Sequence, residues 1–213
     1  MKKMNGWNIF IGAPKDFADK EKVTKRCLEI ANKAKFPTDY QDMYEHLFEN
    51  ENAELFMVMD ENGEIYGFAT CDNIAESSNT YLHGIIIHPD IQGMGFSSRL
   101  LREIVKKDGN EFLTARTHNP RVYEMMSSVA YNGNADLVFP NVTSQNVPKE
   151  VWTVMHSHPA MSEADEDMVV RNAYPDEKIV QEVKNESIYN IFKKLNPTDA
   201  QVIVVCTKKP SWL

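Results

Sequence analysis

Residues 83–98, HGIIIHPDIQGMGFSS, predict a strand, a glycine turn and the start of a helix in direct succession. The strand is the β-branched run at 85–87, which a Pro-Asp pair ends. Apolar residues at helical spacing follow over 96–105. The turn between them, residues 92–95, contains two glycines, and the lack of a Cβ lets a ligand approach the backbone closely.

A glycine turn that leads into a helix is a common binding site for anions. The first N–H groups of the helix have no acceptor within it, and the helix dipole favours negative charge. A phosphate-bearing ligand is therefore predicted, and a turn required only for packing is the alternative. The chain has no Gly-x-x-x-x-Gly-Lys-Ser/Thr motif of nucleoside triphosphatases. A dinucleotide-binding turn starting at Gly93 would need a third glycine where Ser98 stands.

The turn resembles motif A of the GNAT family, the GCN5-related N-acetyltransferases, whose pattern is Arg/Gln-x-x-Gly-x-Gly/Ala. Gln92 and Gly95 match this pattern, and Ser97 departs from its last position but is small. Asn119 then begins a segment similar to motif B, Asn-x-x-Ala-x-x-Leu-Tyr, in which Met126 replaces the usual tyrosine. Because both motifs occur in the family's order, the chain resembles a GNAT protein.

The resemblance covers residues 53–139 well and implies the α/β acyl-CoA N-acyltransferase fold, a mixed, mostly antiparallel central sheet with flanking helices. Periodicity and turn signals predict the elements individually. The predicted strands are 7–11, 55–59, 65–71, 81–87, 111–117, 135–139 and 201–206. The predicted helices are 16–34, the segment after a capping box of Thr38 and Gln41, 96–105, the segment opened by Asn119, 148–156 and 187–195. We therefore expect one domain, 1–213, with a large helical insertion at about 141–199 before the final strand.

The resemblance also implies direct transfer of an acetyl group from acetyl-CoA to a primary amine of a small molecule or peptide. Main-chain groups of the central strand would contact the thioester carbonyl and pantetheine, the turn would hold the pyrophosphate, and motif B would bind the pantetheine arm. The implied coenzyme-binding residues are Ile85, Ile86, Ile87, Gln92, Gly93, Met94, Gly95, Phe96, Ser97, Ser98 and Asn119.

The departure at Met126 leaves the catalytic acid to be found. Tyr123 lies one helical turn earlier and is the candidate acid, with a packed aromatic side chain as the alternative. His83 is the candidate base at the acceptor end of the strand, with a structural histidine as the alternative. His156 and His158 lack a third ligand at metal-binding spacing, so no metal site is predicted.

The composition limits the partners. The net charge of −8 gives no support for nucleic acid binding, disfavours a toxin that acetylates aminoacyl-tRNA, and favours a cationic or amine acceptor. The chain has three widely spaced cysteines, no apolar run of membrane-spanning length and no signal sequence, so we expect a cytoplasmic protein. The inserted segment is expected to cover the acceptor pocket, with Trp152, Tyr174 and Tyr189 reaching it. The alternatives are a contact in an oligomer such as a homodimer, or a segment with no role in binding. An acyl-CoA-binding module that has lost catalysis stays open as a second function.

Overall fold

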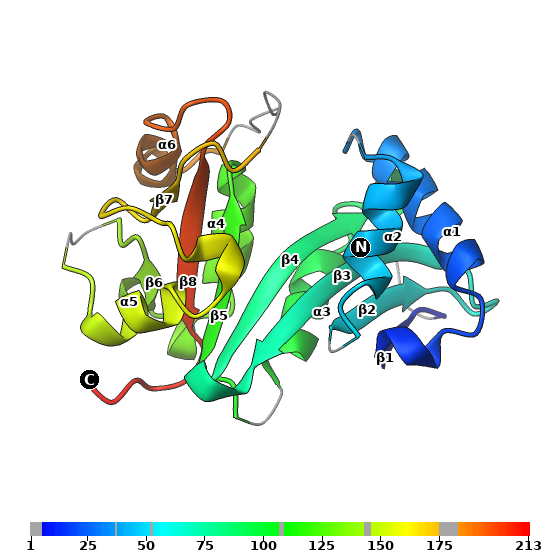
Figure 1. Ribbon diagram of the computed structural model, residues 1–213, viewed down its shortest axis with the longest axis horizontal. Helices are drawn as coiled ribbons and strands as arrows, with labels where there is room; N and C mark the ends of the chain where they lie inside the picture. The colour runs from blue at the N-terminus through cyan, green and yellow to red at the C-terminus, as the bar shows by residue number, and fades with distance from the viewer. Residues whose placement is uncertain (1–5, 37, 52, 107–108, 143–145, 175–182) are drawn as a thin grey trace. The chain divides into compact units, whose positions relative to one another are not determined.

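A computed structural model of the chain describes residues 6–36, 38–51, 53–106, 109–142, 146–174 and 183–213. The chain forms two compact units. Unit 1 comprises Met1–Asn73 and Leu82–Ile104, and unit 2 comprises Ile74–Tyr81 and Val105–Leu213. Strand β4 (Asn79–Ile87) contributes its first three residues to unit 2 and the rest to unit 1 (Figure 1).

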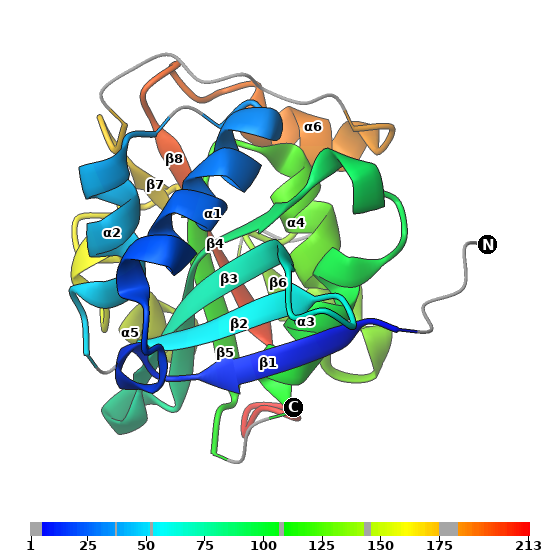
Figure 2. The ribbon, with the colours of Figure 1, turned by 90° about the vertical axis from the view of Figure 1, so that its right-hand side faces the viewer.

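Unit 1 contains four strands in the order β1-β2-β3-β4, and the first two pairings, β1 with β2 and β2 with β3, are antiparallel. Its elements are β1 (Asn8–Gly12), α1 (Lys20–Lys33), α2 (Tyr40–Phe48), β2 (Glu54–Met59), β3 (Ile65–Ile74), β4 and α3 (Phe96–Val105). Figure 2 shows α1 in front of this sheet and α3 behind it. The predicted hairpin is confirmed: Gly63 has a φ of +79°, and Asp60 accepts the backbone N–H groups of Asn62 and Glu64.

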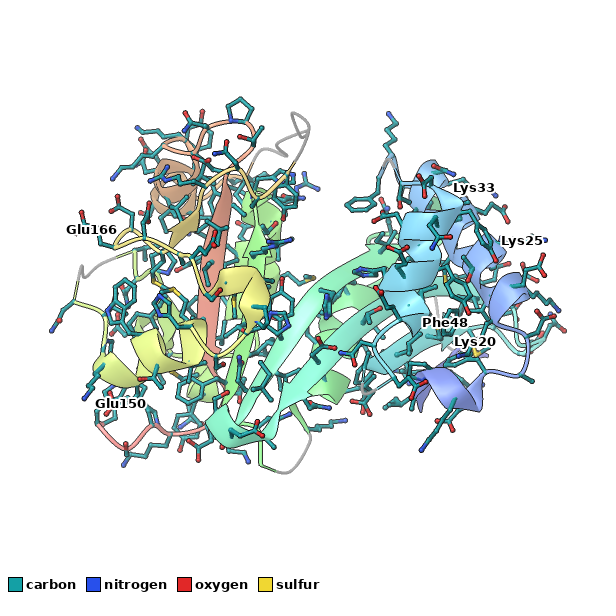
Figure 3. The ribbon with its side chains drawn as sticks, in the orientation of Figure 1. Lys20, Lys25, Lys33, Phe48, Glu150 and Glu166 are labelled. Atoms are coloured by element: carbon teal, nitrogen blue, oxygen red, sulfur yellow. The ribbon has the colours of Figure 1, made fainter. Side chains whose placement is uncertain are left out.

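One face of the unit 1 sheet is covered by α1 and α2, whose apolar side chains form a common core with β2 and β3. This core contains Cys27, Ile30, Ala31, Met43, Leu47, Phe48, Leu55, Met57, Ile65 and Phe68. The opposite side of α1 is polar, and its Lys25 and Lys33 pair with glutamates one turn earlier (Figure 3). Amphipathic spacing along α1 therefore sets which side faces the sheet.

The predicted capping box at the start of α2 is wrong. The N-cap is Asp39, whose carboxylate accepts the backbone N–H of Asp42 at 2.9 Å. The hydroxyl of Thr38 instead donates to the Asp42 carboxylate and, at 3.5 Å, to the Asp39 carbonyl. Aspartate and threonine are both good N-cap residues, and the box pattern alone did not distinguish adjacent candidates.

Unit 2 contains strands in the order β4-β5-β8-β6, with β7 also pairing with β8. Its elements are β5 (Phe112–Thr117), α4 (Pro120–Ser127), β6 (Val138–Phe139), α5 (Lys149–Met155), β7 (Val169–Val170), α6 (Glu186–Phe192) and β8 (Ala200–Cys206). The pairing of β4 with β5 is parallel, and β8 is antiparallel to β5, β6 and β7. The mixed, mostly antiparallel α/β fold predicted from the sequence is therefore confirmed.

Much of the segment predicted as an insertion contributes to the hydrophobic core of unit 2. Its buried residues Val151, Val154, Met155, Met161, Met168 and Val170 pack with side chains from β5 and β8. Helices α5 and α6 lie where periodicity predicted them, whereas the two-residue strand β7 was not predicted. Strand β6 is shorter than expected because residues Ala135–Leu137 form a 3₁₀ turn.

A buried polar pair fixes the register of β4 against β5 within unit 2. Asn79 and Thr114 have no exposed surface, and their side chains hydrogen-bond to each other at 3.0–3.1 Å. Slipping the strands by one residue would leave these groups buried and unpaired, which is costly. The resulting ladder joins Asn79–Tyr81 to Phe112–Thr114. Within the described residues, no helix has the length and hydropathy of a membrane span.

Candidate active site

The glycine turn has space above both of its glycines. Gly93 and Gly95 have φ angles of +77° and +86°, which only glycine adopts without strain. A Cβ built on either residue meets no atom within 4 Å. Glycine is therefore required here by the backbone conformation and not by close contacts with other residues. This argues against a turn selected for packing alone.

Helix α3 begins with N–H groups that its own backbone does not use. Its first helical hydrogen bond runs from the Arg99 N–H to the Gly95 carbonyl at 3.1 Å. Among the described residues, the N–H groups of Phe96, Ser97 and Ser98 have no backbone acceptor, and the first turn carries no acidic side chain. This end of the helix can therefore accept an anion.

The side chain of Gln92 lies back against the strand that precedes the turn. Its Nε2 donates to the carbonyl of Ile87 at 2.9 Å, and its backbone N–H donates to Pro89 at 3.2 Å. The Met94 N–H likewise donates to Ile91 at 3.3 Å. These two residues of the predicted pyrophosphate site thus stabilise the turn, which leaves the glycine and helix N–H groups to face a ligand.

His83, the predicted base, pairs with a carboxylate that sequence reasoning did not identify. Its Nε2 lies 2.9 Å from Oδ2 of Asp72 on β3, and Oδ1 of Asp72 accepts from Nδ2 of Asn50 at 2.8 Å. The His46 ring stands edge-on to His83 with centroids 5.4 Å apart. Burial, followed by the nearby His83, lowers the pKa of His46 to about 4, so His46 is neutral at pH 7. Asp72 and His83 lie on different strands, and no sequence spacing indicated this pair.

Tyr123, the predicted acid, is buried in unit 2. It is 3% exposed, and its hydroxyl donates to the carbonyl of Pro140 at 2.8 Å. Its ring stands edge-on to Phe192, and burial raises the pKa of the phenol. Met126, at the position of the family's tyrosine, is fully buried. This placement favours the packing alternative for Tyr123.

Asn119 is the N-cap of α4, as its place before Pro120 in the sequence suggested. Its side-chain oxygen accepts the Arg121 N–H at 3.0 Å. A contact between this side chain and pantetheine would therefore use the amide nitrogen, Nδ2. The predicted strand residues Ile85 and Ile86 are half-buried, and Ile87 is buried.

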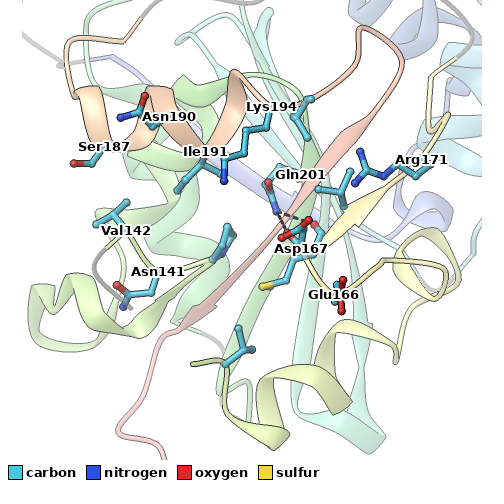
Figure 4. Close-up of a pocket in the computed structure, with 15 residues that line it drawn as sticks. Asn141, Val142, Glu166, Asp167, Arg171, Ser187, Asn190, Ile191, Lys194 and Gln201 are labelled. Carbon is cyan, nitrogen blue, oxygen red and sulfur yellow. Dashed lines mark hydrogen bonds between the residues drawn. The ribbon is translucent and has the colours of Figure 1, made fainter. Parts of the chain in front are cut away.

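Unit 2 also contains an open cavity of about 730 Å³. Figure 4 shows α6 on one side of it and the segment around Glu166 and Asp167 on the other, with Gln201 of β8 at its base. The carboxylates of Glu166 and Asp167 and the ammonium group of Lys194 have no ion-pair partner among the described residues, whereas Arg171 pairs with Asp165 and Asp199. The predicted insertion thus supplies most of a concave surface that is lined by both polar and apolar residues.

The sequence profile of the acetyltransferase (GNAT) family matches residues 24–127. Over this segment the chain belongs to the GNAT family. The match includes His83, the glycine turn, Asn119 and Tyr123, so the candidate residues lie within the family's own region. The predicted family and enzyme class, an acetyltransferase, are confirmed, and acetyl-CoA is the co-substrate that this GNAT membership supports.

Two solved structures align with this chain as matches of fold. The ribosomal-protein-S18-alanine N-acetyltransferase from Escherichia coli aligns over 96% of this chain and 97% of its own, with 15% identity and a TM-score of 0.54. Tetrahymena GCN5 aligns over 52% of this chain and 70% of its own, with 13% identity and a TM-score of 0.44. The first alignment confirms the GNAT fold. No curated protein matches the sequence.

Proposed function

We propose that this protein is an acetyl-CoA-dependent N-acetyltransferase whose acceptor is a primary amine of a small molecule or peptide. The observation that carries the proposal is the glycine turn. Gly93 and Gly95 have positive φ angles and open space where a Cβ would lie, and the helix that follows begins with N–H groups that have no backbone acceptor among the described residues. Such an arrangement binds a pyrophosphate through its backbone. It lies within the region matched to the acetyltransferase family.

The residues present in unit 1 fit the coenzyme in two places. The N–H groups of Gly93, Gly95 and residues 96–98 would hold the pyrophosphate. Only the first three residues of β4 pair with β5. The backbone groups of residues 85–87, further along the strand, would therefore hydrogen-bond to the pantetheine arm and the thioester carbonyl. Asn119 belongs to unit 2, and its contact with pantetheine stays a prediction from the family resemblance. Gln92 and Met94 would act indirectly, by keeping the turn in shape.

When bound, the coenzyme supplies an acetyl thioester whose carbonyl carbon the acceptor nitrogen attacks. An alkylammonium acceptor must first lose a proton at neutral pH. We assign that proton to His83, a partly exposed imidazole whose Nε2 lies 2.9 Å from Oδ2 of Asp72. As the C–S bond breaks and the amide forms, the second nitrogen proton ends on the thiolate. Tyr123 is not assigned this proton transfer, since its hydroxyl is already bonded to Pro140.

The acceptor that we propose is a cationic amine, which the negative net charge of the protein attracts. The net charge of −8 raises the local concentration of cationic molecules such as polyamines and aminoglycosides. The exposed Tyr189 and the acidic residues of the inserted segment lie on a part of the chain that we propose contributes to acceptor recognition. The three cysteines are buried and form no disulfide, which supports a reducing compartment, the cytoplasm.

Release of free thiol from acetyl-CoA tests the proposal. The purified chain is incubated with polyamines, aminoglycosides, amino acids or peptides, and a mock reaction without acceptor gives the background. Acceptor-dependent thiol release with a matching acetylated product by mass spectrometry is the expected result. Tight coenzyme binding without release on any acceptor would instead favour the second candidate, a binding module, which the buried Met126 at the family's tyrosine position makes worth testing.

A further inference from the structure

We propose that the cavity of unit 2 is a binding site for a short apolar peptide whose two termini are free. The cavity has a volume of about 730 Å³, and the residues that line it lie between Pro140 and Gln201, all within this unit. A volume of this size is typical of sites for small ligands. The inference goes beyond the proposed function, because it concerns binding alone and uses no residue of the proposed coenzyme site.

The acidic wall of the cavity is held in place by a carboxylate that does not line it. Oδ1 of Asp165 accepts the backbone N–H groups of Asp167 and Val169, both at 3.0 Å, and Oδ2 pairs with Arg171 at 2.7 Å. These bonds fix the backbone of the segment. The side chains of Glu166 and Asp167 take no part in them, and both residues are exposed. This wall therefore has two negative charges that no described residue neutralises.

The opposite wall is one face of α6 and the turn that follows it (Figure 4). Four lining residues recur at helical spacing and share this face: Ser187, Asn190, Ile191 and Lys194. Ile188 and Phe192, on another side of the helix, are buried and pack it against the rest of unit 2. The helix therefore presents an exposed ammonium group to the cavity, and no ion-pair partner for it lies among the described residues.

The base of the cavity contains a buried hydrogen-bond acceptor. Gln201 is 2% exposed, and its Nε2 donates to the carbonyls of Asp167 and Met168 at 3.1 Å and 2.8 Å. Its Oε1 accepts no hydrogen bond from a described residue, yet this atom is not sealed from solvent. An N–H donor in the cavity, such as that of a peptide bond, would complete the hydrogen bonding of this side chain.

The charges on the two walls select a ligand that has both signs. Glu166 and Asp167 attract an ammonium group and repel a phosphate, whereas Lys194 attracts a carboxylate and repels a polyamine. A single α-amino acid has both charges on one carbon atom, but the cavity places their partners on opposite walls. A short peptide separates its termini by roughly 3.3–3.6 Å per extended residue.

The remaining lining residues suit aliphatic side chains. Val142, Val147 and Leu195 are among the apolar residues of the cavity, and Val142 is 36% exposed. Apolar side chains of a ligand would remove this surface from water, which is favourable. The ligand class is therefore a peptide of a few residues with aliphatic side chains and charged ends.

Isothermal titration calorimetry of the full chain with the tripeptide Ala-Leu-Ala, in the absence of acetyl-CoA, tests the site. Acetylating the N-terminus of the peptide or amidating its C-terminus should each raise Kd by about twofold to fivefold, since each removes one charge pair. Lys194→Gln should raise Kd for the free peptide by a similar factor and leave Kd for the amidated peptide unchanged. Glu166→Gln combined with Asp167→Asn should raise Kd for the free peptide and leave Kd for the acetylated peptide unchanged.

Two nearby charges outside the cavity supply matched controls. Lys193 and Glu163 are exposed and do not line it. Lys193→Gln and Glu163→Gln should leave Kd for the free peptide unchanged, because neither side chain reaches the ligand.

A lack of saturable binding up to about 10 mM peptide would overturn the inference. Equal effects of Lys194→Gln on the free and the amidated peptide would also overturn it, since the carboxylate would then not lie at this side chain. A parent chain that binds the peptide as predicted but acetylates no amine would support this site and refute the proposed function.

Discussion

Replacing Gly95 with alanine should weaken coenzyme binding far more than it weakens the fold. At a φ of +86°, an alanine costs about 1–2 kcal/mol of backbone strain, partly offset by the lower entropy of the unfolded chain. The new Cβ meets no protein atom within 4 Å, so steric cost within the protein is absent. A net loss near 1 kcal/mol corresponds to about 2–4 °C in Tm for a chain of this size.

The same Cβ would stand where the pyrophosphate approaches the N–H groups. Losing one charge-assisted hydrogen bond there costs about 1.5–3 kcal/mol, which is a roughly 10- to 100-fold rise in Kd. Isothermal titration calorimetry with acetyl-CoA measures this change directly. The dissociation constant is therefore expected to respond strongly while the unfolding temperature responds weakly.

Gly63→Ala is the matched control for this experiment. Gly63 has a φ of +79°, and a Cβ built on it also meets nothing within 4 Å, but it lies in the β2–β3 hairpin turn. Its variant should lose a similar few degrees of Tm and keep the parent's coenzyme affinity. If Gly95→Ala binds acetyl-CoA as tightly as Gly63→Ala does, the turn is not the coenzyme site.

Three further outcomes follow from buried or exposed side chains. Tyr123→Phe should lower Tm by about 2–4 °C, since it leaves the Pro140 carbonyl without its donor at a cost of about 1 kcal/mol, and should leave kcat within about threefold; a hundredfold loss in a thiol-release assay would make the phenol the acid. Burial alone would raise the pKa of Asp199, but hydrogen bonds from Arg171 and from the backbones of Asn172 and Asn196 lower it. A carboxyl with a lowered folded-state pKa stabilises the protein above the unfolded value of about 3.9 and loses this contribution as the pH falls below it. Asp199→Asn should therefore reduce Tm more at pH 7 than at pH 3 by calorimetry, and an equal reduction at both would contradict this. Tyr189→Ser, at a 45% exposed position, should raise the KM for the acceptor and leave the Kd for acetyl-CoA unchanged, whereas an unchanged acceptor KM would remove Tyr189 from recognition.

The order of strands and helices was largely predictable because local signals mark it. The Asn-Gly turn at 62–63 fixes a hairpin, β-branched runs mark β4 and β8, and Asn119-Pro120 marks the start of α4. The glycine turn was identified for the same reason, because a backbone with positive φ is usually built from glycine. Each of these features is decided within a few neighbouring residues.

Features decided by distant residues were not predictable in this way. Asp72 pairs with His83 across strands, and Pro140 receives the Tyr123 hydroxyl from 17 positions away. The part that the inserted segment takes in the core of unit 2 also depends on tertiary packing, which periodicity does not specify. The side chain of Gln92 matches the family's pattern, yet its hydrogen bond to Ile87 became visible only in three dimensions.

The position of β8 between β5 and β6 has a consequence for how the protein is made. The ribosome releases β5 and β6 long before residues 200–206, because sixty residues separate Phe139 from Ala200. During that interval the nascent chain carries two strands with the space between them unfilled, and apolar side chains such as Phe112 and Leu113 lack their final neighbours. Long-range pairing of this kind closes slowly and leaves edges open to association. Unit 1 contains no residue of β8, so it can fold before β8 has been synthesised and has completed the sheet of unit 2.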